Sequence, residues 1–187
     1  MGYFAVLDTE TNWKNEVMSI GIVLADEITM EPFRGKYIVI DPAYKKGGLF
    51  SSVLFIDSVR VNRICSYQQA IEDILDWFAL YGVKKIFAYN AGFDFSHLPQ
   101  LQEFEWYDIL RLAAYKEYNS FIHEQMPCFK TGRLKRNYGV EPILQLLSKN
   151  EDYREVHNAL CDALDELKIM QYLSHPLEVY KVSAIKR

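Results

Sequence analysis

Two carboxylates near the start of the chain could bind a metal ion. Asp8 and Glu10 form a D-x-E pair at the end of the apolar run 3–8. If this run is a strand, its alternation directs both side chains to the same side of the sheet. Carboxylates placed in this way repel each other unless a cation lies between them. A solvated strand end is the commoner meaning of so short a pattern, so the pair needs support from other residues.

A third acid follows a second apolar run. Asp94 ends the segment that begins at Asn90 and includes Phe93, directly after the run KKIFAYN at 84–90. Open α/β sheets bind ligands beyond the carboxyl ends of their strands, which is where this acid would lie. An aspartate that merely caps a helix would give the same local pattern.

A histidine and a fourth acid lie at the start of the last predicted helix, about 158–173. His157 could accept a proton near neutral pH, and Asp162, about one turn away, could hold a metal-bound water within its reach. The alternative is an exposed histidine beside an acid that complements the helix dipole. The helix is expected to bury an apolar face and to expose its acids; the apolar face is Leu160, Leu164, Leu167 and Met170, and the acids are Asp162, Asp165 and Glu166.

The elements that must position these side chains can be outlined from the pattern of apolar residues. Strands are predicted at 3–8, 17–25, 35–40, 84–90 and 104–108, with 41–65 as an irregular surface segment. Ser66 and Gln69 predict a capped helix that ends at Gly82, and further helices are expected after 90, after Asp108 and near 141. The fold class is therefore α/β, a mixed five-stranded sheet flanked by helices, in a single domain over 1–187.

Composition excludes several classes of protein. The net charge of −4 over 187 residues argues against a protein that wraps nucleic acid electrostatically, although bound metal ions could reverse the local field. Three cysteines without a CxxC pair predict neither a zinc site nor a disulfide framework. No apolar run reaches the roughly 18 residues of a membrane span, and the first residues lack a signal-peptide pattern. We therefore expect a cytoplasmic location and no membrane association.

Taken in order, the D-x-E pair, the N-x-x-F-D segment and the H-x-x-x-x-D segment resemble the three exonuclease motifs of the DEDDh 3′-to-5′ exonucleases. This family includes the epsilon proofreading subunit of bacterial replicases, ribonuclease T and oligoribonuclease. The resemblance covers roughly residues 3–173 and implies a ribonuclease H-like fold. It implies that Asp8, Glu10 and Asp162 ligate metal ions, that Asp94 helps through a ligand water, and that His157 deprotonates the nucleophile.

Two further segments bear on the resemblance. Ala159 completes the family's H-x-A-x-x-D pattern, and Asp108 with Leu110 and Leu112 looks like its D-x-L-x-L segment. Many members have Thr-Gly after D-x-E-T, whereas here Thr11 is followed by Asn12 and Trp13. Trp13 would then either stack on a base of the substrate or pack inward.

The chemistry implied is phosphodiester hydrolysis assisted by two divalent ions, ~3.5 to 4 Å apart. Hard Mg²⁺ or Mn²⁺ suits a set of four carboxylates without a thiolate. The product would be a nucleoside 5′-monophosphate. Candidate substrate contacts are Thr9, Thr11, Trp13, Asn90, Phe93 and Arg133. Arg133 belongs to a basic cluster at 130–136, for which a solvated surface turn is an equal alternative.

The predicted substrate is the 3′ end of single-stranded DNA or RNA, with DNA slightly favoured. Alternatives are an RNA-trimming exoribonuclease or oligoribonuclease, a catalytically silent nucleic-acid-binding subunit, and a phosphatase for small phosphate esters. A complete set of acids and a histidine argues against the silent subunit, because a binding module has no need of a metal cage. Family members occur as free dimers and as subunits, so a homodimer and association with a polymerase are both expected alternatives.

Overall fold

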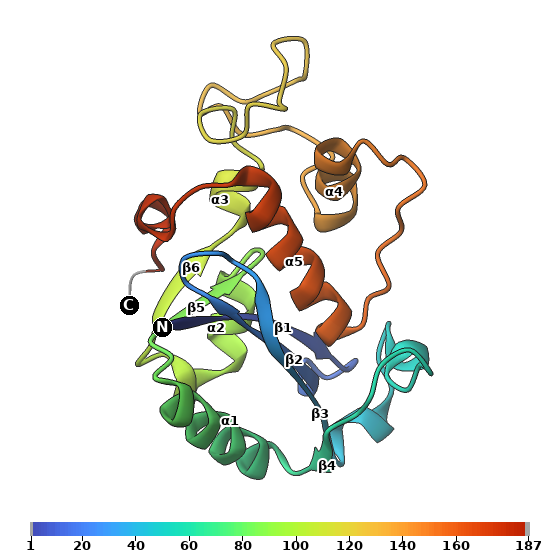
Figure 1. Ribbon diagram of the computed structural model, residues 1–187. Helices are drawn as coiled ribbons and strands as arrows, with labels where there is room; N and C mark the ends of the chain where they lie inside the picture. The colour runs from blue at the N-terminus through green and yellow to red at the C-terminus, as the bar shows by residue number, and fades with distance from the viewer. Residues whose placement is uncertain (1, 186–187) are drawn as a thin grey trace.

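A six-stranded mixed sheet forms the centre of the protein (Figure 1), in a computed structural model that describes residues 2–185. The strand order is β4-β3-β2-β1-β5-β6. The strands are β1 (Tyr3–Thr11), β2 (Val17–Asp26), β3 (Pro32–Ile40), β4 (Arg63–Cys65), β5 (Lys85–Ala88) and β6 (Glu105–Asp108). β1 to β3 are antiparallel neighbours, whereas β5 and β6 continue the sheet parallel to β1. The carboxyl ends of β1, β5 and β6 therefore lie at one edge of the sheet.

Helices cover both faces of the sheet. The α-helices are α1 (Tyr67–Tyr81), α2 (Gly92–His97), α3 (Leu110–Ala113), α4 (Val140–Ser148) and α5 (Ala159–Leu173). Short 3-10 helices lie at Ala43–Lys46, Ser51–Val53, Pro99–Leu101 and Leu177–Ser183. α1 and α5 lie on opposite faces of the sheet (Figure 1), and each covers its own cluster of buried apolar side chains. No helix within 2–185 is long and apolar enough to cross a membrane.

The predicted start and end of α1 are confirmed. The Ser66 side chain accepts a hydrogen bond from the backbone N–H of Gln69, and the Gln69 side chain accepts one from the backbone N–H of Ser66. Gly82 ends the helix with a φ of 65°, a left-handed conformation that glycine adopts without a steric cost.

The α/β class and the mixed sheet with flanking helices are confirmed, but the strand count was wrong, because the sheet has six strands and not five. The sixth strand, β4, lies inside the segment 41–65 that the sequence predicts to be irregular. Its three residues pair in parallel with the end of β3. A run of three residues is too short for its periodicity to predict a strand. The helix expected after Asp108 is present as α3, which ends after one turn at Ala113.

The prediction that α5 exposes its acids was wrong. Asp162, Asp165 and Glu166 are only 4%, 5% and 2% exposed. The reason is that α5 packs on β1 and β2 on one side and on α4 on the other, so that both flanks of the helix are covered. Acids on a helix in this position must find a hydrogen-bond donor, a proton or a cation.

A glycine lets the start of α5 approach the sheet closely. Gly21 lies in β2 directly opposite Asp8 of β1. A Cβ atom built on Gly21 would lie 2.1 Å from the carbonyl carbon of Ala159, a separation that no real side chain could adopt. The absence of a side chain at residue 21 is therefore what allows the first turn of α5 to lie beside the acids of β1.

Candidate active site

Three carboxylates from two elements converge at the carboxyl edge of the sheet. Asp8 and Glu10 come from the end of β1, and Asp162 comes from the first turn of α5. One oxygen of each lies within 4.8 Å of the others. Strand alternation places the two β1 acids on the face that α5 covers, and the close approach at Gly21 brings the third acid to them.

The oxygens of this cluster fit a cation. Oδ2 of Asp8 and Oδ1 of Asp162 are both buried and accept no hydrogen bond from any residue of 2–185. No lysine or arginine of the same range forms an ion pair with Asp8, Glu10 or Asp162. Buried carboxylates without partners are costly, and a hard divalent ion prefers oxygen ligands of this kind.

Without a metal ion, burial and nearby carboxylates raise the pKa of each of the three acids. Burial, and then repulsion from Asp162, raises the pKa of Glu10 to about 8. Burial, and then repulsion from Glu155, raises the pKa of Asp162 to about 8. Burial, and then the neighbouring carboxylates, raises the pKa of Asp8 well above its ordinary value. A bound cation would offset each of these effects.

Asp94 lies beside the cluster but is held differently. It is 2% exposed, and its Oδ1 accepts a hydrogen bond of 2.7 Å from the hydroxyl of Thr9. Burial raises the pKa of Asp94 to about 7, although the hydrogen bond from Thr9 acts in the opposite direction. Asp94 does not belong to the cluster of Asp8, Glu10 and Asp162, whose oxygens lie within 4.8 Å of one another. Because Oδ1 is bonded to Thr9, Oδ2 of Asp94 is left for other contacts.

His157 lies at the mouth of the site, where its side chain is 40% exposed. Its backbone has a φ of 60°, which turns the chain sharply just before α5 begins. The imidazole stacks on the ring of Phe50, with 4.2 Å between ring centroids and 20° between planes. The next residue, Asn158, caps α5 and donates hydrogen bonds to Tyr37 Oη (3.1 Å) and to the carbonyl of Val53 (2.9 Å). These contacts position the imidazole.

Two acids near the site are not among the residues that the motifs select. The Glu155 carboxylate lies 3.9 Å from His157 Nδ1, and one ligand atom of each lies within 4.8 Å of an Asp162 oxygen. Glu166 is 2% exposed, and its Oε2 has no hydrogen-bond partner within 2–185. The helical spacing of Glu166, four residues after Asp162, could have indicated it. Glu155 precedes the helix in an irregular segment and has no such signal.

The cleft above the cluster has a volume of about 310 Å³. All five motif residues line it, as do four of the predicted substrate contacts, Thr9, Thr11, Asn90 and Phe93. Apolar side chains that the motifs do not select, Leu49 and Phe50, form another part of its wall. Leu49 is 67% exposed and Phe93 is 39% exposed, so both offer apolar surface to a ligand. Thr9 is only 4% exposed, and its hydroxyl donates its hydrogen bond to Asp94.

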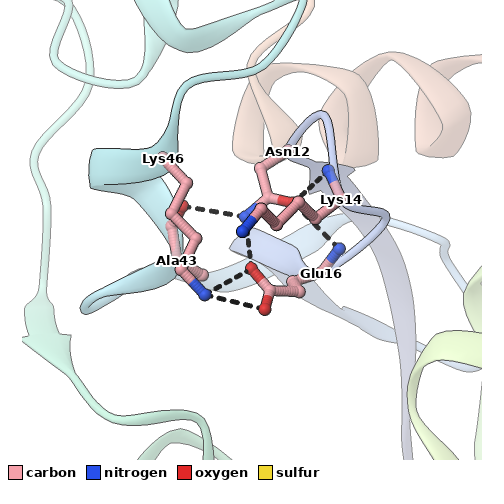
Figure 2. A network of polar contacts seen from close by, with 5 residues as sticks. All are labelled: Asn12, Lys14, Glu16, Ala43 and Lys46. Carbon is pink, nitrogen blue, oxygen red and sulfur yellow. Dashed lines mark hydrogen bonds and ion pairs between the residues drawn. The ribbon is translucent and has the colours of Figure 1, made fainter.

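Trp13 lies on the turn between β1 and β2, outside the walls of the cleft, and does not pack inward. Its side chain is 70% exposed, and its backbone N–H bonds to the carbonyl of Gly47. Asn12, only 5% exposed, shapes this turn. Its side-chain oxygen accepts hydrogen bonds from the backbone N–H groups of Lys14 and Glu16. Its side-chain NH2 group donates to the carboxylate of Glu16 and to the backbone carbonyl of Ala43 (Figure 2). The loop is therefore built around Asn12.

Arg133, the remaining predicted substrate contact, does not line the cleft. It lies in a neighbouring hollow of about 510 Å³ that shares two wall residues, Tyr89 and Asn90, with the cleft. The basic cluster at 130–136 therefore lies beside the site rather than within it.

Solved structures of several exonucleases are similar to this chain. The nuclease domain of 3′hExo, a DEDDh family member bound to rAMP, has a TM-score of 0.65 at 15% identity, with 99% of this chain and 96% of that chain covered. Exonuclease X in complex with 5′-overhanging duplex DNA has a TM-score of 0.55 at 17% identity, with 96% and 98% covered. The E. coli exonuclease I complex with single-stranded DNA has a TM-score of 0.61 at 12% identity, and the match covers 93% of this chain but 40% of that one.

No sequence model of a protein family matches the chain, and no curated protein matches it in sequence. The structural similarity extends over nearly the whole of this chain and includes an exonuclease of the DEDDh family. The fold is therefore that of the ribonuclease H-like DEDDh exonuclease domain, as the order of the motifs predicts.

Proposed function

We propose that this chain is a metal-dependent 3′-to-5′ exonuclease that removes nucleotides from single-stranded nucleic acid ends, with 1–187 as a single exonuclease domain. The observation that carries the proposal is the convergence of Asp8, Glu10 and Asp162 at the carboxyl edge of a sheet with the DEDDh exonuclease fold, where Asp8 and Asp162 each have a buried unpaired oxygen. His157 at the mouth of the same cleft supports it.

Asp8, Glu10 and Asp162 would hold two Mg²⁺ or Mn²⁺ ions, and Asp94 would contribute through a water. Such ions lower the pKa of water and stabilise the charge that develops on the leaving oxygen. Thr9 fixes the orientation of Asp94 through its 2.7 Å hydrogen bond, so the anchoring does not depend on substrate. Burial, and then repulsion from Asp8, raises the pKa of Glu166 well above its ordinary value, so this buried carboxyl group favours its neutral form unless a cation lies near it.

His157 would act as the general base. The imidazole takes a proton from the attacking water, whose oxygen forms a new bond to the last phosphorus of the strand. The bond from that phosphorus to the 3′ oxygen of the preceding nucleotide breaks. This oxygen takes a proton from solvent water and becomes a new 3′-hydroxyl, while the imidazolium returns its proton to solvent. One water is consumed, and the products are a nucleoside 5′-monophosphate and a strand shorter by one nucleotide.

The cleft would receive the terminal nucleotide between the exposed apolar side chains of Leu49 and Phe93. Apolar and aromatic contacts tolerate every base, because each base has a π-face. The similar structures include one bound to rAMP and others in complex with DNA, so the proposal covers both sugars.

The test is a time course on 5′-labelled single-stranded DNA and RNA of the same sequence, with Mg²⁺, Mn²⁺ or chelator. We expect a metal-dependent ladder of products that shorten from the 3′ end. The ratio of the shortening rates on DNA and on RNA gives the preference for one sugar. Binding without shortening would indicate a silent subunit instead. Release of phosphate from nucleotides without shortening would indicate a phosphatase.

Two substitutions test the assigned roles. Asp8→Ala should abolish hydrolysis, and His157→Ala should lower kcat by ~10²- to 10⁴-fold, the range of general base catalysis, without unfolding the protein. The controls are Asp76→Ala, on the exposed side of α1, and His123→Ala, on an exposed loop. Wild-type rates in Asp8→Ala or His157→Ala would contradict the assignment.

A further inference from the structure

Three hollows adjoin one another and lead away from the catalytic cleft. The cleft shares Tyr89 and Asn90 with the hollow of about 510 Å³. That hollow in turn shares Tyr115 and Arg133 with another of about 400 Å³. Shared walls make the three a continuous path along the surface, from an acidic end at the cleft to a basic and aromatic end.

We infer that this path binds the phosphates of the substrate strand on the 5′ side of the bond that is cut. We call it the basic groove, and it is formed by Arg111, Tyr115, Lys130, Arg133 and Tyr138. The inference rests on the proposed exonuclease function, because it places the strand whose last phosphodiester lies in the cleft.

Arg133 supplies a cation without an acidic partner. No carboxylate within 2–185 lies in ion-pair distance of it. Its guanidinium carbon lies 5.1 Å from the ring centroid of Tyr138 and 5.2 Å from that of Phe129. Rings on which a guanidinium rests hold its plane and leave its N–H groups free to bond a ligand.

Arg111 supplies a second guanidinium, stacked on Tyr115 with 3.9 Å from its central carbon to the ring centroid. One terminal nitrogen is buried and has no hydrogen-bond partner within 2–185. The other lies 3.6 Å from the carboxylate of Glu117, whose side chain is 64% exposed and therefore a weak competitor. The Arg111 side chain is still 31% exposed, so a phosphate oxygen in the groove can pair with its accessible nitrogen in place of Glu117.

The acid that lines the same hollow does not neutralise these arginines. Asp108 uses Oδ1 to accept the backbone N–H groups of Asn90 (2.9 Å) and Leu110 (3.0 Å), and it forms no ion pair with Arg111 or Arg133. The groove therefore keeps its positive charge although the whole chain carries a net charge of −4.

The chemistry of the substrate decides which part of the strand the groove binds. The last nucleotide ends in a 3′-hydroxyl, so every phosphate other than the one in the cleft lies on the 5′ side. Arginine pairs with phosphate oxygens in a bidentate geometry, and aromatic rings stack on bases of any sequence. The rate of cleavage should therefore rise with strand length from a dinucleotide until the groove is filled, and then level off.

The first test measures binding of a labelled single-stranded oligonucleotide in chelator, which prevents hydrolysis, at several salt concentrations. For single strands, each phosphate contact adds about 0.7 to the slope of log affinity against log salt. Arg133→Gln and Arg111→Gln should each make the slope shallower by about 0.7. Arg34→Gln is the control with the same loss of charge, because Arg34 is exposed on β3 at the end of the sheet remote from the cleft. Its slope should equal that of the wild type.

The second test compares two substrates in Mg²⁺. The p-nitrophenyl ester of thymidine 5′-monophosphate has one phosphodiester and no 5′ strand, so it occupies the cleft alone. Each arginine variant should lose at least ~10-fold in kcat/KM on an oligonucleotide and keep the wild-type kcat/KM on this ester, since only the oligonucleotide loses a charge-assisted contact. An equal loss on both substrates would indicate a structural role and overturn the inference, as would an unchanged salt slope.

The two proposals fail in different ways. If the wild type hydrolyses neither substrate but the salt slopes change as expected, the groove binds the strand and the exonuclease function is wrong. If the wild type shortens strands but the arginine variants retain wild-type slopes and rates, the groove is wrong and the function is retained. If Arg111→Gln lowers the melting temperature, Arg111→Lys replaces it in both tests, because lysine keeps the charge and loses only the bidentate contact. Arg133→Gln tests the groove independently of Arg111.

Discussion

Glu155 shows how a residue outside the motifs can belong to the site. It is half-buried, its backbone N–H is held by the carboxylate of Glu141 at 3.0 Å, and its own carboxylate faces His157 Nδ1 at 3.9 Å. A carboxylate in this position can hold the orientation of a histidine. Glu155 is thus a positioning residue in the proposed mechanism.

We expect Glu155→Gln to lower kcat about 10-fold, within the range for loss of an orienting carboxylate, and to leave KM nearly unchanged. The glutamine retains the shape of the side chain, so the change isolates the charge. Steady-state kinetics on a single-stranded oligonucleotide give the result. Glu151→Gln, an exposed acid in the same segment, is the control. A Glu155→Gln enzyme with wild-type kcat would exclude the positioning role.

At the scale of elements, the site depends on how closely α5 lies on β2. Gly21 is the contact point, because its missing side chain leaves room for the backbone of Ala159 and Leu160. The same helix carries Asp162 in its first turn, while the strand paired with β2 carries Asp8. A displacement of the start of α5 would therefore separate the proposed metal ligands directly.

Gly21→Ala should reduce both stability and activity. The new methyl group must push the start of α5 away from the sheet, an overpacking that typically costs 1 to 3 kcal/mol. A thermal melt and the exonuclease assay measure the two effects, and we expect the affinity for Mn²⁺ to fall as well. Gly35→Ala is the matched control, since its Cβ would lie 3.4 Å from the Leu160 side chain, an ordinary contact. Equal melting temperatures for the two variants would contradict this account of α5.

At the scale of the whole molecule, the buried acids couple metal binding to stability. Burial and mutual repulsion raise the pKa of Glu10 from 4.5 to about 8, and that of Asp162 from 3.8 to about 8. Without metal, the folded chain keeps protons that the unfolded chain releases. The stability that these groups contribute is present at low pH and is lost as the pH rises through about 8.

The melting temperature of the metal-free protein should therefore fall between pH 6 and pH 9, and Mn²⁺ should raise it more at pH 9 than at pH 6. Thermal melts in chelator and in Mn²⁺ across this range give the comparison. Glu10→Gln removes one titrating group and should flatten the metal-free curve. A metal-free melting temperature that stays constant or rises over this range would rule out the proposed coupling.

The sequence by itself indicated the four acids and the histidine that line the cleft together. The D-x-E pair, the acid after β5 and the histidine and acid at the start of α5 can be read locally, because strand alternation and helix starts are set by neighbouring residues. The α/β class and the order of the major elements followed from the same patterns. The strand β4 and the end of α3 did not, since pairing with distant segments decides them.

Only the tertiary structure decided what surrounds those residues. The stacking of Phe50 on His157 and the bond from Thr9 to Asp94 each join segments more than eighty residues apart. The basic groove likewise brings Arg111 and Arg133 beside a cleft built mainly from other segments. No local pattern encodes these distances, because they depend on how helices and irregular segments pack on the sheet. The physical reason is the same for the buried acids of α5, whose exposure depends on α4, a separate element that covers them.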